Sequence, residues 1–310
     1  MVRSSLANLD LNLLRTLDVL LTERNVTRTA QQLGVTQPAV SAALARLRRH
    51  FDDALLDRVG NRYELTPLAG QLRAETTLAL GAVRRVFEAS SRFDPATAEN
   101  EFTIALSDYA ALVMGEELSR TFAGSAPHVR LRIQSPVPQI VDNITETLRL
   151  VDGVVLPHGF VHDVPHTDLF ADDWVGIAAT DNPLLTDGLT LEQLPEMSWV
   201  VTFDSRTAFT PAQQHLRIYG VEPRIVVVVE NFIVVPYFVA GTDRVGMVQR
   251  RLADRMVGLA DVRTFDLPFG TVRMVESFWW HPAHRGDSAH AWLRRTLREI
   301  GHRVADAPGP

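Results

Sequence analysis

Residues 36–49 combine groups that can recognise DNA bases with groups that can hold phosphates. Their sequence is TQPAVSAALARLRR. Gln37 can hydrogen-bond a base edge or a phosphate, and the carbons of proline and alanine can touch thymine methyl groups. If the segment is helical, with about 100° between successive residues, one side carries Pro38, Ala42, Ala45, Arg46 and Arg49. This small and basic side predicts a surface that enters the major groove of DNA.

Two short helices around a tight turn would position these side chains. In the second helix, apolar residues at helical spacing form a stripe that we expect to face a core. The stripe consists of Val40, Leu44, Leu47 and Phe51. Gly34 stands where the first helix must end. Asn25 or Thr27 can cap the first helix and Thr36 the second. The alternative is an ordinary helical hairpin whose arginines are only solvated; the turn, the early proline and the small, basic side together favour DNA binding.

The flanking segments complete the module that this pair of helices needs. Leucines on one face of residues 10–23 predict a supporting helix. After the pair, residues 55–65 have the pattern of a short hairpin that turns at Gly60 and Asn61. Arg58 and Arg62 would then project from a β-wing beside the recognition helix. A plain surface hairpin is the alternative.

A long helix is predicted from Pro67 to about residue 92, because Thr66 and Pro67 form an N-cap and a first-turn proline. Its apolar stripe consists of Leu68, Leu72, Ala79, Ala82, Val83 and Val86. No partner for this stripe is evident nearby in the sequence, so we expect the helix to pair with its copy. A dimer would read an inverted repeat. Packing against the C-terminal part of the same chain is the alternative.

From residue 94 onward the pattern changes to alternating strands and helices. Strands are expected at residues 102–106, 129–133, 154–156, 175–179, 199–202, 225–229, 245–248 and 272–278, and helices at 109–122, 139–150, 211–216, 232–240 and 287–304. Such alternation predicts a mostly parallel sheet covered by helices. Connections near residues 168–173 and 261–267 suggest two subdomains joined by two crossing strands. Their strand ends would border a ligand-binding cleft.

Composition limits the classes of function. The chain has 310 residues, no cysteine and a net charge of −6, which excludes disulfides, thiolate nucleophiles and thiolate metal sites. Residues 1–93 carry 13 arginines against 9 acidic residues, so a basic N-terminal module precedes an acidic body. No secretory segment and no membrane-spanning run is recognisable. We therefore expect a cytoplasmic protein without a membrane partner.

Histidines are the residues that could most readily support metal chemistry. His158, His162 and His166 are spaced four apart, with Asp163 and Asp168 nearby; on a helix three imidazoles would share one face. The glycine at 159 and the proline at 165 favour a loop instead. A second group at residues 281, 284 and 290 is interrupted by proline and glycine. We expect no metal, no cofactor and no enzyme activity, since no nucleophile, phosphate-loop or zinc-protease motif is present.

The N-terminal quarter of the chain resembles LysR-type transcriptional regulators. The resemblance is carried by LNLLRTLDVLLTERNVTRTAQQLGVTQPAVSAALARLR and LLDRVGNRYELTPLAG, and more loosely by FTIALSDYAALVM and ENFIVVPYFVAGTDRVGMV. It is closest to the branch of nodulation activators and of naphthalene and salicylate catabolism regulators. This resemblance implies a winged helix-turn-helix, a dimerising linker helix and a two-lobed α/β effector domain of the periplasmic-binding-protein type. It also implies tetramers, inverted-repeat DNA sites and a small-molecule effector, with RNA polymerase as a possible further partner.

The resemblance also assigns roles to particular residues. Thr36, Gln37, Pro38 and Ser41 match the start of the recognition helix, and Arg58 and Arg62 match the wing. Ala42 replaces a polar residue of many members, so methyl contact would replace a hydrogen bond there. The residues that match the walls of the effector cleft are Ser107, Asp108, Pro136, Val137, residues 203–207, Asn231 and Phe232.

Side-chain chemistry suggests the kind of effector. Ser107, Ser205 and Thr207 could hold a carboxylate, with added charge from Arg206, and Phe203, Phe209, Phe232 and Phe269 could sandwich an aromatic ring. We expect an aromatic or carboxylic metabolite, although each phenylalanine could equally belong to the core. The expected division is a DNA-binding domain at 1–66, a linker helix at 67–93 and an effector domain at 94–310, whose lobes are 100–168 with 268–305 and 169–267. The alternative function is a DNA-binding protein whose α/β body serves only assembly.

Overall fold

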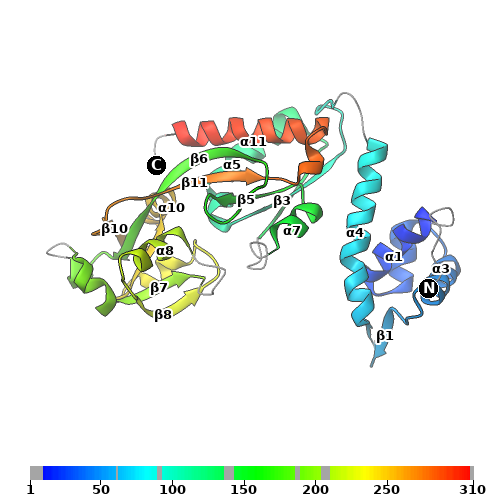
Figure 1. Ribbon diagram of the computed structural model, residues 1–310, viewed down its shortest axis with the longest axis horizontal. Helices are drawn as coiled ribbons and strands as arrows, with labels where there is room; N and C mark the ends of the chain where they lie inside the picture. The colour runs from blue at the N-terminus through cyan, green and yellow to red at the C-terminus, as the bar shows by residue number, and fades with distance from the viewer. Residues whose placement is uncertain are drawn as a thin grey trace. The chain divides into compact units, whose positions relative to one another are not determined.

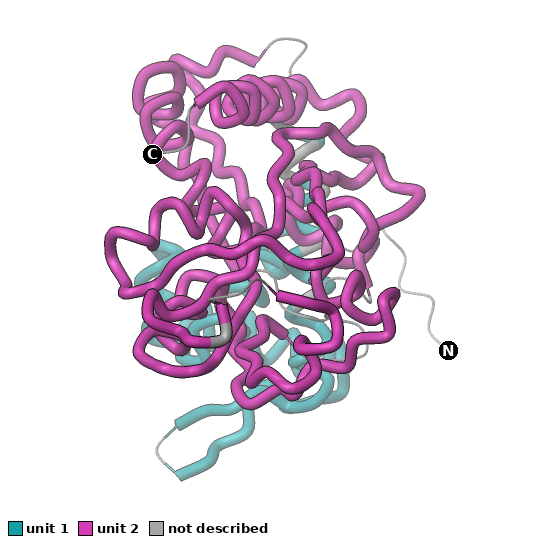
Figure 2. The backbone as a smooth tube through the Cα atoms, turned by 90° about the vertical axis from the view of Figure 1, so that its left-hand side faces the viewer, with its two compact units in different colours: residues 1–89 teal, residues 90–310 magenta. Residues whose placement is uncertain are grey.

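The computed structural model describes residues 10–60, 62–88, 93–135, 143–185, 189–203 and 210–307. The chain divides into two compact units, residues 1–89 and 90–310 (Figures 1 and 2). Each unit has a hydrophobic core of its own. Among the described residues no helix has the length and apolar character needed to cross a bilayer.

The first unit is built from short helices and one hairpin. Its elements are α1 (Leu11–Glu23), α2 (Val26–Leu33), α3 (Gln37–Phe51), β1 (Leu56–Val59), β2 (Arg62–Leu65) and α4 (Pro67–Glu88). The predicted stripe of α3 packs as expected: Val40, Leu44 and Leu47 are buried against leucines of α1, and Phe51 is partly buried beside them. Burying this side of α3 leaves its opposite side facing solvent.

Local backbone chemistry fixes the turn between α2 and α3. Asn25 caps α2, its side chain accepting a hydrogen bond from the Arg28 amide at 3.0 Å. Gly34 ends that helix in the left-handed conformation, with φ +66°, where a β-carbon would be strained. Thr36 occupies the N-cap position of α3 but makes no capping hydrogen bond with its side chain. The prediction that the Thr36 side chain caps α3 is therefore wrong. Pro38 has no backbone N–H, so the first turn of α3 has one amide fewer that needs a hydrogen-bond partner.

The predicted hairpin is present. Strands β1 and β2 are antiparallel, and Val59 pairs with Arg62 across the turn. Gly60 again has a positive φ, of +61°; Asn61 lies outside the described residues. The hairpin points away from the helices of its unit (Figure 1).

The long helix α4 begins as predicted but has a partner that the sequence did not reveal. The Thr66 hydroxyl accepts from the Ala69 amide at 3.1 Å and donates to the Asp53 carboxylate at 2.7 Å. The first half of α4 packs beside α1, where Ala69 and Leu72 join the core of the unit (Figure 1). Farther along, Val86 is 72% exposed. The expectation of no neighbouring partner is thus wrong for the first half of the helix.

The second unit is organised around one curled sheet of nine strands. The order is β4-β3-β5-β11-β6-β9-β7-β8, with β10 paired to β6. The bounds are β3 (Glu101–Leu106), β4 (Arg130–Gln134), β5 (Gly153–Pro157), β6 (His166–Ala179), β7 (Ser198–Thr202), β8 (Arg224–Val229), β9 (Val245–Gln249), β10 (Val262–Phe265) and β11 (Val272–Trp279).

The sheet is mixed rather than mostly parallel. Strand β3 runs parallel to β4 and β5, and β7 runs parallel to β8 and β9, but β6 and β11 are antiparallel to each other and to the neighbours on either side. The 14 residues of β6 pair first with β11 and then with β9 and β10. The segment 168–173, predicted as a connection, is therefore part of a strand. This strand, β6, extends through two groups of strands: a first group of β3, β4, β5 and β11, and a second group of β7, β8, β9 and β10.

Helices cover both faces of this sheet. They are α5 (Asp108–Ser125), α7 (Ile144–Leu150), α8 (Pro211–Ile218), α9 (Val235–Val239), α10 (Arg250–Met256) and α11 (Ser288–Asp306). Helix α11 lies along β6 and beside α5 (Figure 1). The expected helix at 232–240 is reduced to α9, α10 was not predicted, and the expected helix at 139–150 is described only over α7.

Candidate DNA-binding and effector-binding sites

All nine residues predicted to contact DNA are exposed. They are Thr36 at the N-cap of α3, then Gln37, Pro38, Ser41, Ala42, Arg46 and Arg49 from α3, and Arg58 and Arg62 from the hairpin. Since the buried stripe of α3 lies on the opposite side, the exposed side is fixed in orientation by the core. It carries small residues along its middle and arginines toward its C-terminal end.

The arginines have only weak partners within the chain. The Arg46 guanidinium lies 3.4 Å from the Asp10 carboxylate, and both side chains are substantially exposed. The Nε groups of Arg49 and Arg58 donate to the carbonyls of Ala45 and Gly60 at 3.4 and 3.3 Å. Exposed pairs of this kind contribute little to stability, at most about 1 kcal/mol. These guanidinium groups can therefore exchange their present partners for phosphates at low cost.

The first expected wall of the effector site follows β3. Ser107 caps α5 and its hydroxyl accepts from the Ala110 amide at 3.1 Å. The next residue, Asp108, accepts a hydrogen bond from the amide of Ile233 at 2.8 Å. Residues 107–108 and 231–233 are thus brought together from opposite ends of the sheet, as the sequence predicts for two walls of one site.

Aromatic rings gather beside these residues. The rings of Phe203 and Phe232 are 6.0 Å apart, and Trp174 lies 5.8 Å from Phe232. Phe203 has a positive φ of +60°, and its carbonyl accepts from the buried Gln213 side chain at 2.8 Å. A non-glycine residue held in this conformation at a strand end is a recurrent feature of binding sites. Phe269, by contrast, stacks on Tyr219 and does not join this group.

Two buried polar groups beside these rings were missed by the sequence analysis. Trp174 and Gln249 face each other across β6 and β9, and neither the Trp174 Nε1 nor the Gln249 Oε1 has a hydrogen-bond partner among the described residues. Buried polar atoms are usually paired, so this donor and this acceptor point to a ligand or to water. No sequence signal could locate them, because they become neighbours only through the register of β6 against β9.

Several predicted effector contacts cannot be placed. Pro136, Val137, Ser205, Arg206, Thr207 and Phe209 lie outside the described residues. The structure therefore describes five of the predicted contacts, namely Ser107, Asp108, Phe203, Asn231 and Phe232.

A buried acidic cluster lies where the two groups of strands meet. Asp172 of β6 accepts from the Tyr109 hydroxyl of α5 and from the Arg251 amide at the start of α10. Glu276 of β11 is buried nearby, with one carboxyl oxygen unpartnered among the described residues. Burial, reinforced by the negative charge of Asp172, raises the pKa of Glu276 to about 8. Glu276 is accordingly protonated at neutral pH.

This shift predicts a pH-dependent stability. In the unfolded chain Glu276 ionises near its ordinary pKa of 4.5, whereas in the folded chain it keeps its proton up to about pH 8. The folded state binds more protons in that interval, so the free energy of unfolding falls as pH rises from about 4.5 to 8. Glu276→Gln should remove this slope, measured by urea unfolding at several pH values. The exposed Glu299→Gln is the control; an unchanged slope in Glu276→Gln would assign the dependence to another group.

The second group of histidines is structural. The rings of His284 and His290 stack at 4.3 Å, and the His290 Nε2 lies 2.7 Å from the Asp152 carbonyl oxygen. Burial lowers the pKa of His290 to about 3, so this imidazole is neutral at physiological pH. The hydrogen bond between His290 and Asp152 therefore holds the first turn of α11 against the residue that precedes β5.

Comparison with known proteins agrees with this architecture. Residues 11–70 match the bacterial regulatory helix-turn-helix protein of the lysR family, and residues 96–301 match the LysR substrate binding domain. Nodulation protein D 2 of Rhizobium tropici is 34% identical over 292 residues, which cover 93% of this chain and 92% of the relative.

Solved structures show the same fold. A probable transcriptional regulator from Pseudomonas aeruginosa has a TM-score of 0.75 and 29% identity, covering 95% of this chain and 98% of its own. Full-length CbnR complexed with its target DNA has a TM-score of 0.65 at 15% identity, covering 96% of this chain and all (100%) of its own; it shows the fold alone.

The exposed recognition helix, the wing and the mixed two-group sheet define a DNA-binding regulator with an effector domain. The chain belongs to the LysR family of transcriptional regulators. Its relatives are regulators, not enzymes, in agreement with the expectation from sequence.

Proposed function

We propose that this regulator binds an inverted-repeat DNA site as a dimer that assembles further into a tetramer. The observation that supports this proposal is the exposed side of α3, small in its middle and basic at its end, held outward by the buried Val40, Leu44 and Leu47. Gln37, Pro38, Ser41 and Ala42 would contact bases, with Thr36 at the helix start. Arg46, Arg49, Arg58 and Arg62 would hold phosphates. CbnR, which shares this fold, has been seen with its target DNA.

Pairing of protomers would use the second half of α4. In that part of the helix Val86 is exposed. An exposed apolar stripe on a helix is stabilised by a second copy. The linker helix is accordingly proposed to begin at Pro67, between a DNA-binding domain at 1–66 and an effector domain from residue 94. The site of action is the cytoplasm, where chromosomal DNA and RNA polymerase are available.

The proposed effector is a small aromatic acid bound between the two groups of strands. The rings of Trp174, Phe203 and Phe232 would hold its aromatic part. The Trp174 Nε1, which has no partner among the described residues, can donate to a carboxylate, and the Gln249 Oε1 can accept from a hydroxyl group. We propose that the lobes comprise residues 100–168 with 268–305 and residues 169–267. Effector binding between them would change the separation of the lobes, and this change would alter the spacing of the DNA-binding domains in the oligomer.

One footprinting experiment tests both parts of this proposal. Full-length protein should protect a twofold-symmetric site upstream of a regulated gene at moderate salt. The half-sites should be spaced by about one helical turn or a multiple of it. Adding salicylate or benzoate should change the protected pattern. If no twofold-symmetric site on genomic fragments were protected, the proposed sequence-specific DNA binding would be contradicted. A footprint that no aromatic acid alters would favour the alternative in which the α/β body serves only assembly.

Thermal unfolding tests the aromatic site separately. The melting temperature should rise with salicylate concentration, because a ligand at 100 times its Kd adds about 2.7 kcal/mol to the unfolding free energy. Trp174→Phe keeps an aromatic ring but removes the donor, so the shift should shrink markedly. The control is Trp280→Phe, because Trp280 lies against Arg294 and outside the proposed effector site. This variant should show the same salicylate-induced shift in melting temperature as the wild type. Equal shifts in both variants would exclude Trp174 from the site.

A further inference from the structure

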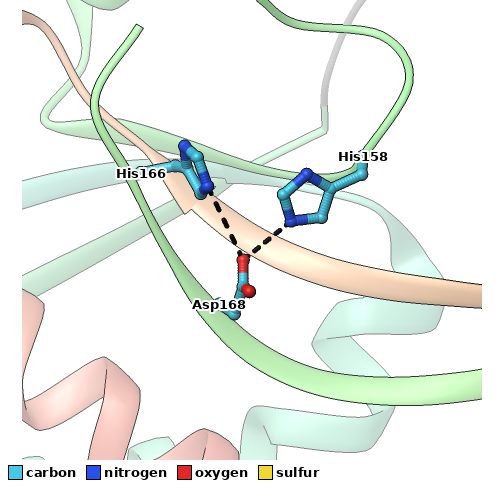
Figure 3. Close-up of side chains that lie close together, drawn as sticks. All are labelled: His158, His166 and Asp168. Atoms are coloured by element: carbon cyan, nitrogen blue, oxygen red, sulfur yellow. Dashed lines mark hydrogen bonds and ion pairs between the residues drawn. The ribbon is translucent and has the colours of Figure 1, made fainter.

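Two histidines and one aspartate that are separated along the chain meet on one face of the sheet. His158 follows β5, whereas His166 begins β6 and Asp168 lies two residues later on the same strand. Figure 3 shows both imidazole rings turned toward the Asp168 carboxylate. The His158 Nε2 is 2.7 Å from the Asp168 Oδ1, and the His166 Nε2 is 3.8 Å from the same oxygen.

We propose that His158, His166 and Asp168 bind a divalent transition-metal ion of the zinc class. Their three donor atoms lie within 4.8 Å of one another. Tetrahedral coordination at about 2.0–2.1 Å needs donor atoms roughly 3.3 Å apart. The 2.7 Å pair must therefore open and the 3.8 Å pair close, each by about half an ångström. The two imidazole nitrogens lie within 4.8 Å of each other, so this pair must close as well; all three residues are exposed, which leaves their side chains room to move.

Surrounding groups hold His166 and Asp168 in suitable orientations, whereas the His158 Nε2, which lies 3.0 Å from the Ser277 hydroxyl, must give up its proton to bind a metal. The His166 Nδ1 lies 3.5 Å from the Val164 carbonyl oxygen; a proton there leaves the lone pair on Nε2, the atom that faces Asp168. The hydroxyl of Ser277, which is fully buried, donates to the Asp168 Oδ1 at 2.8 Å. Trp279 supports both rings, with centroids 4.4 Å from His166 and 5.4 Å from His158. Such outer contacts commonly orient metal-binding imidazoles and carboxylates.

The ligand set favours one class of ion. Two imidazoles and a single carboxylate suit Zn²⁺, Ni²⁺ or Cu²⁺ better than Mg²⁺ or Ca²⁺, which prefer several oxygen ligands. The remaining position would open to a surface pocket of about 520 Å³ whose lining includes His162 and Arg285. A water molecule or His162 can complete the coordination there. Arg285 adds positive charge, which would favour an anionic fourth ligand.

Metal binding would fasten the loop at residues 158–165 onto β6. His158 is the first residue of this loop and His166 directly follows it, so one ion would join both of its ends. Because β6 continues into the second group of strands, the ion would be attached to the strand that extends through both groups. This site is separate from the proposed effector residues, and its test does not depend on them.

Titration of the full-length, tag-free protein with Zn²⁺ tests the proposal. Competition with a chromogenic chelator should show one ion per chain, and Co²⁺ should give the visible absorption of a tetrahedral complex. His166→Ala removes one ligand but leaves the hydrogen bond between Ser277 and Asp168 intact. We expect at least a tenfold loss of affinity in His166→Ala, and a comparable loss in Asp168→Asn.

His128→Ala, which removes an exposed histidine elsewhere, should bind Zn²⁺ like the wild type. Circular dichroism of each variant checks that the fold is retained. A wild-type protein that binds no Zn²⁺ at micromolar concentration overturns the proposal. So does a folded His166→Ala variant with wild-type affinity, because the ion would then sit elsewhere.

Discussion

Gly301→Ala should destabilise the second unit strongly. A β-carbon at Gly301 of α11 would lie 2.5 Å from the carbonyl oxygen of Leu169 and 2.7 Å from its Cα, both in the backbone of β6. Backbone atoms of a central strand cannot rotate away as a side chain can. The helix would have to shift outward and lose packing of its buried Leu297, Ile300 and Val304. We expect a loss of about 3 kcal/mol in unfolding free energy, at the upper end of overpacking effects.

Tryptophan fluorescence during urea unfolding measures this effect selectively, because all five tryptophans belong to residues 90–310. Gly115→Ala is the matched control. Gly115 also lies inside a helix, α5, but nothing lies within 4 Å of where its β-carbon would be. Alanine there should be neutral or add about 0.5–1 kcal/mol through helix propensity. Similar midpoints for Gly301→Ala and the wild type would mean that α11 is not held tightly against β6.

Ala42→Glu should abolish specific DNA binding while the fold is retained. Ala42 is exposed on the side of α3 opposite the buried stripe, so glutamate adds no strain to the core. In the proposed complex this residue meets the floor of the major groove, where a longer side chain is obstructed and a carboxylate is repelled by phosphates. We expect affinity to fall at least a hundredfold, or about 2.7 kcal/mol.

Gln71→Glu introduces the same charge at an exposed position of α4 and is the control for a general electrostatic effect. Fluorescence anisotropy with operator and random DNA at two salt concentrations distinguishes the roles of neighbouring residues. Arg58→Ala should weaken binding to both DNAs and reduce the salt dependence, whereas Gln37→Ala should mainly reduce discrimination. Equal losses for Ala42→Glu and Gln71→Glu would show that α3 does not occupy the groove.

The DNA-binding unit was predictable because its determinants are local. Residues three and four apart specified the buried side of α3, and a glycine with positive φ ended α2 where the sequence predicted. The hairpin was likewise specified by two short strands and a turn. The helix α4 shows the limit of this reasoning: its apolar residues predicted a partner, but only the fold identified α1 as the partner of its first half.

The effector domain was predictable in class but not in detail. Alternation of strands and helices indicated the α/β architecture, yet residues 168–173 carry a mixture of apolar and acidic residues that did not appear strand-like. In the folded chain Asp172 is paired with Tyr109 and the Arg251 amide, which compensates its burial. Such compensation comes from residues 63 and 79 positions away, beyond the reach of any local pattern.

The sequence by itself determined the family, the recognition helix, the wing and the charge difference between the two parts of the chain, because each depends on residue type and short spacing. Only the tertiary structure brought Trp174 beside Phe232 and opposite Gln249, and His158 beside His166 and Asp168. The physical reason is strand pairing. Register across a sheet is set by the packing of the whole core, so it determines which distant side chains become neighbours.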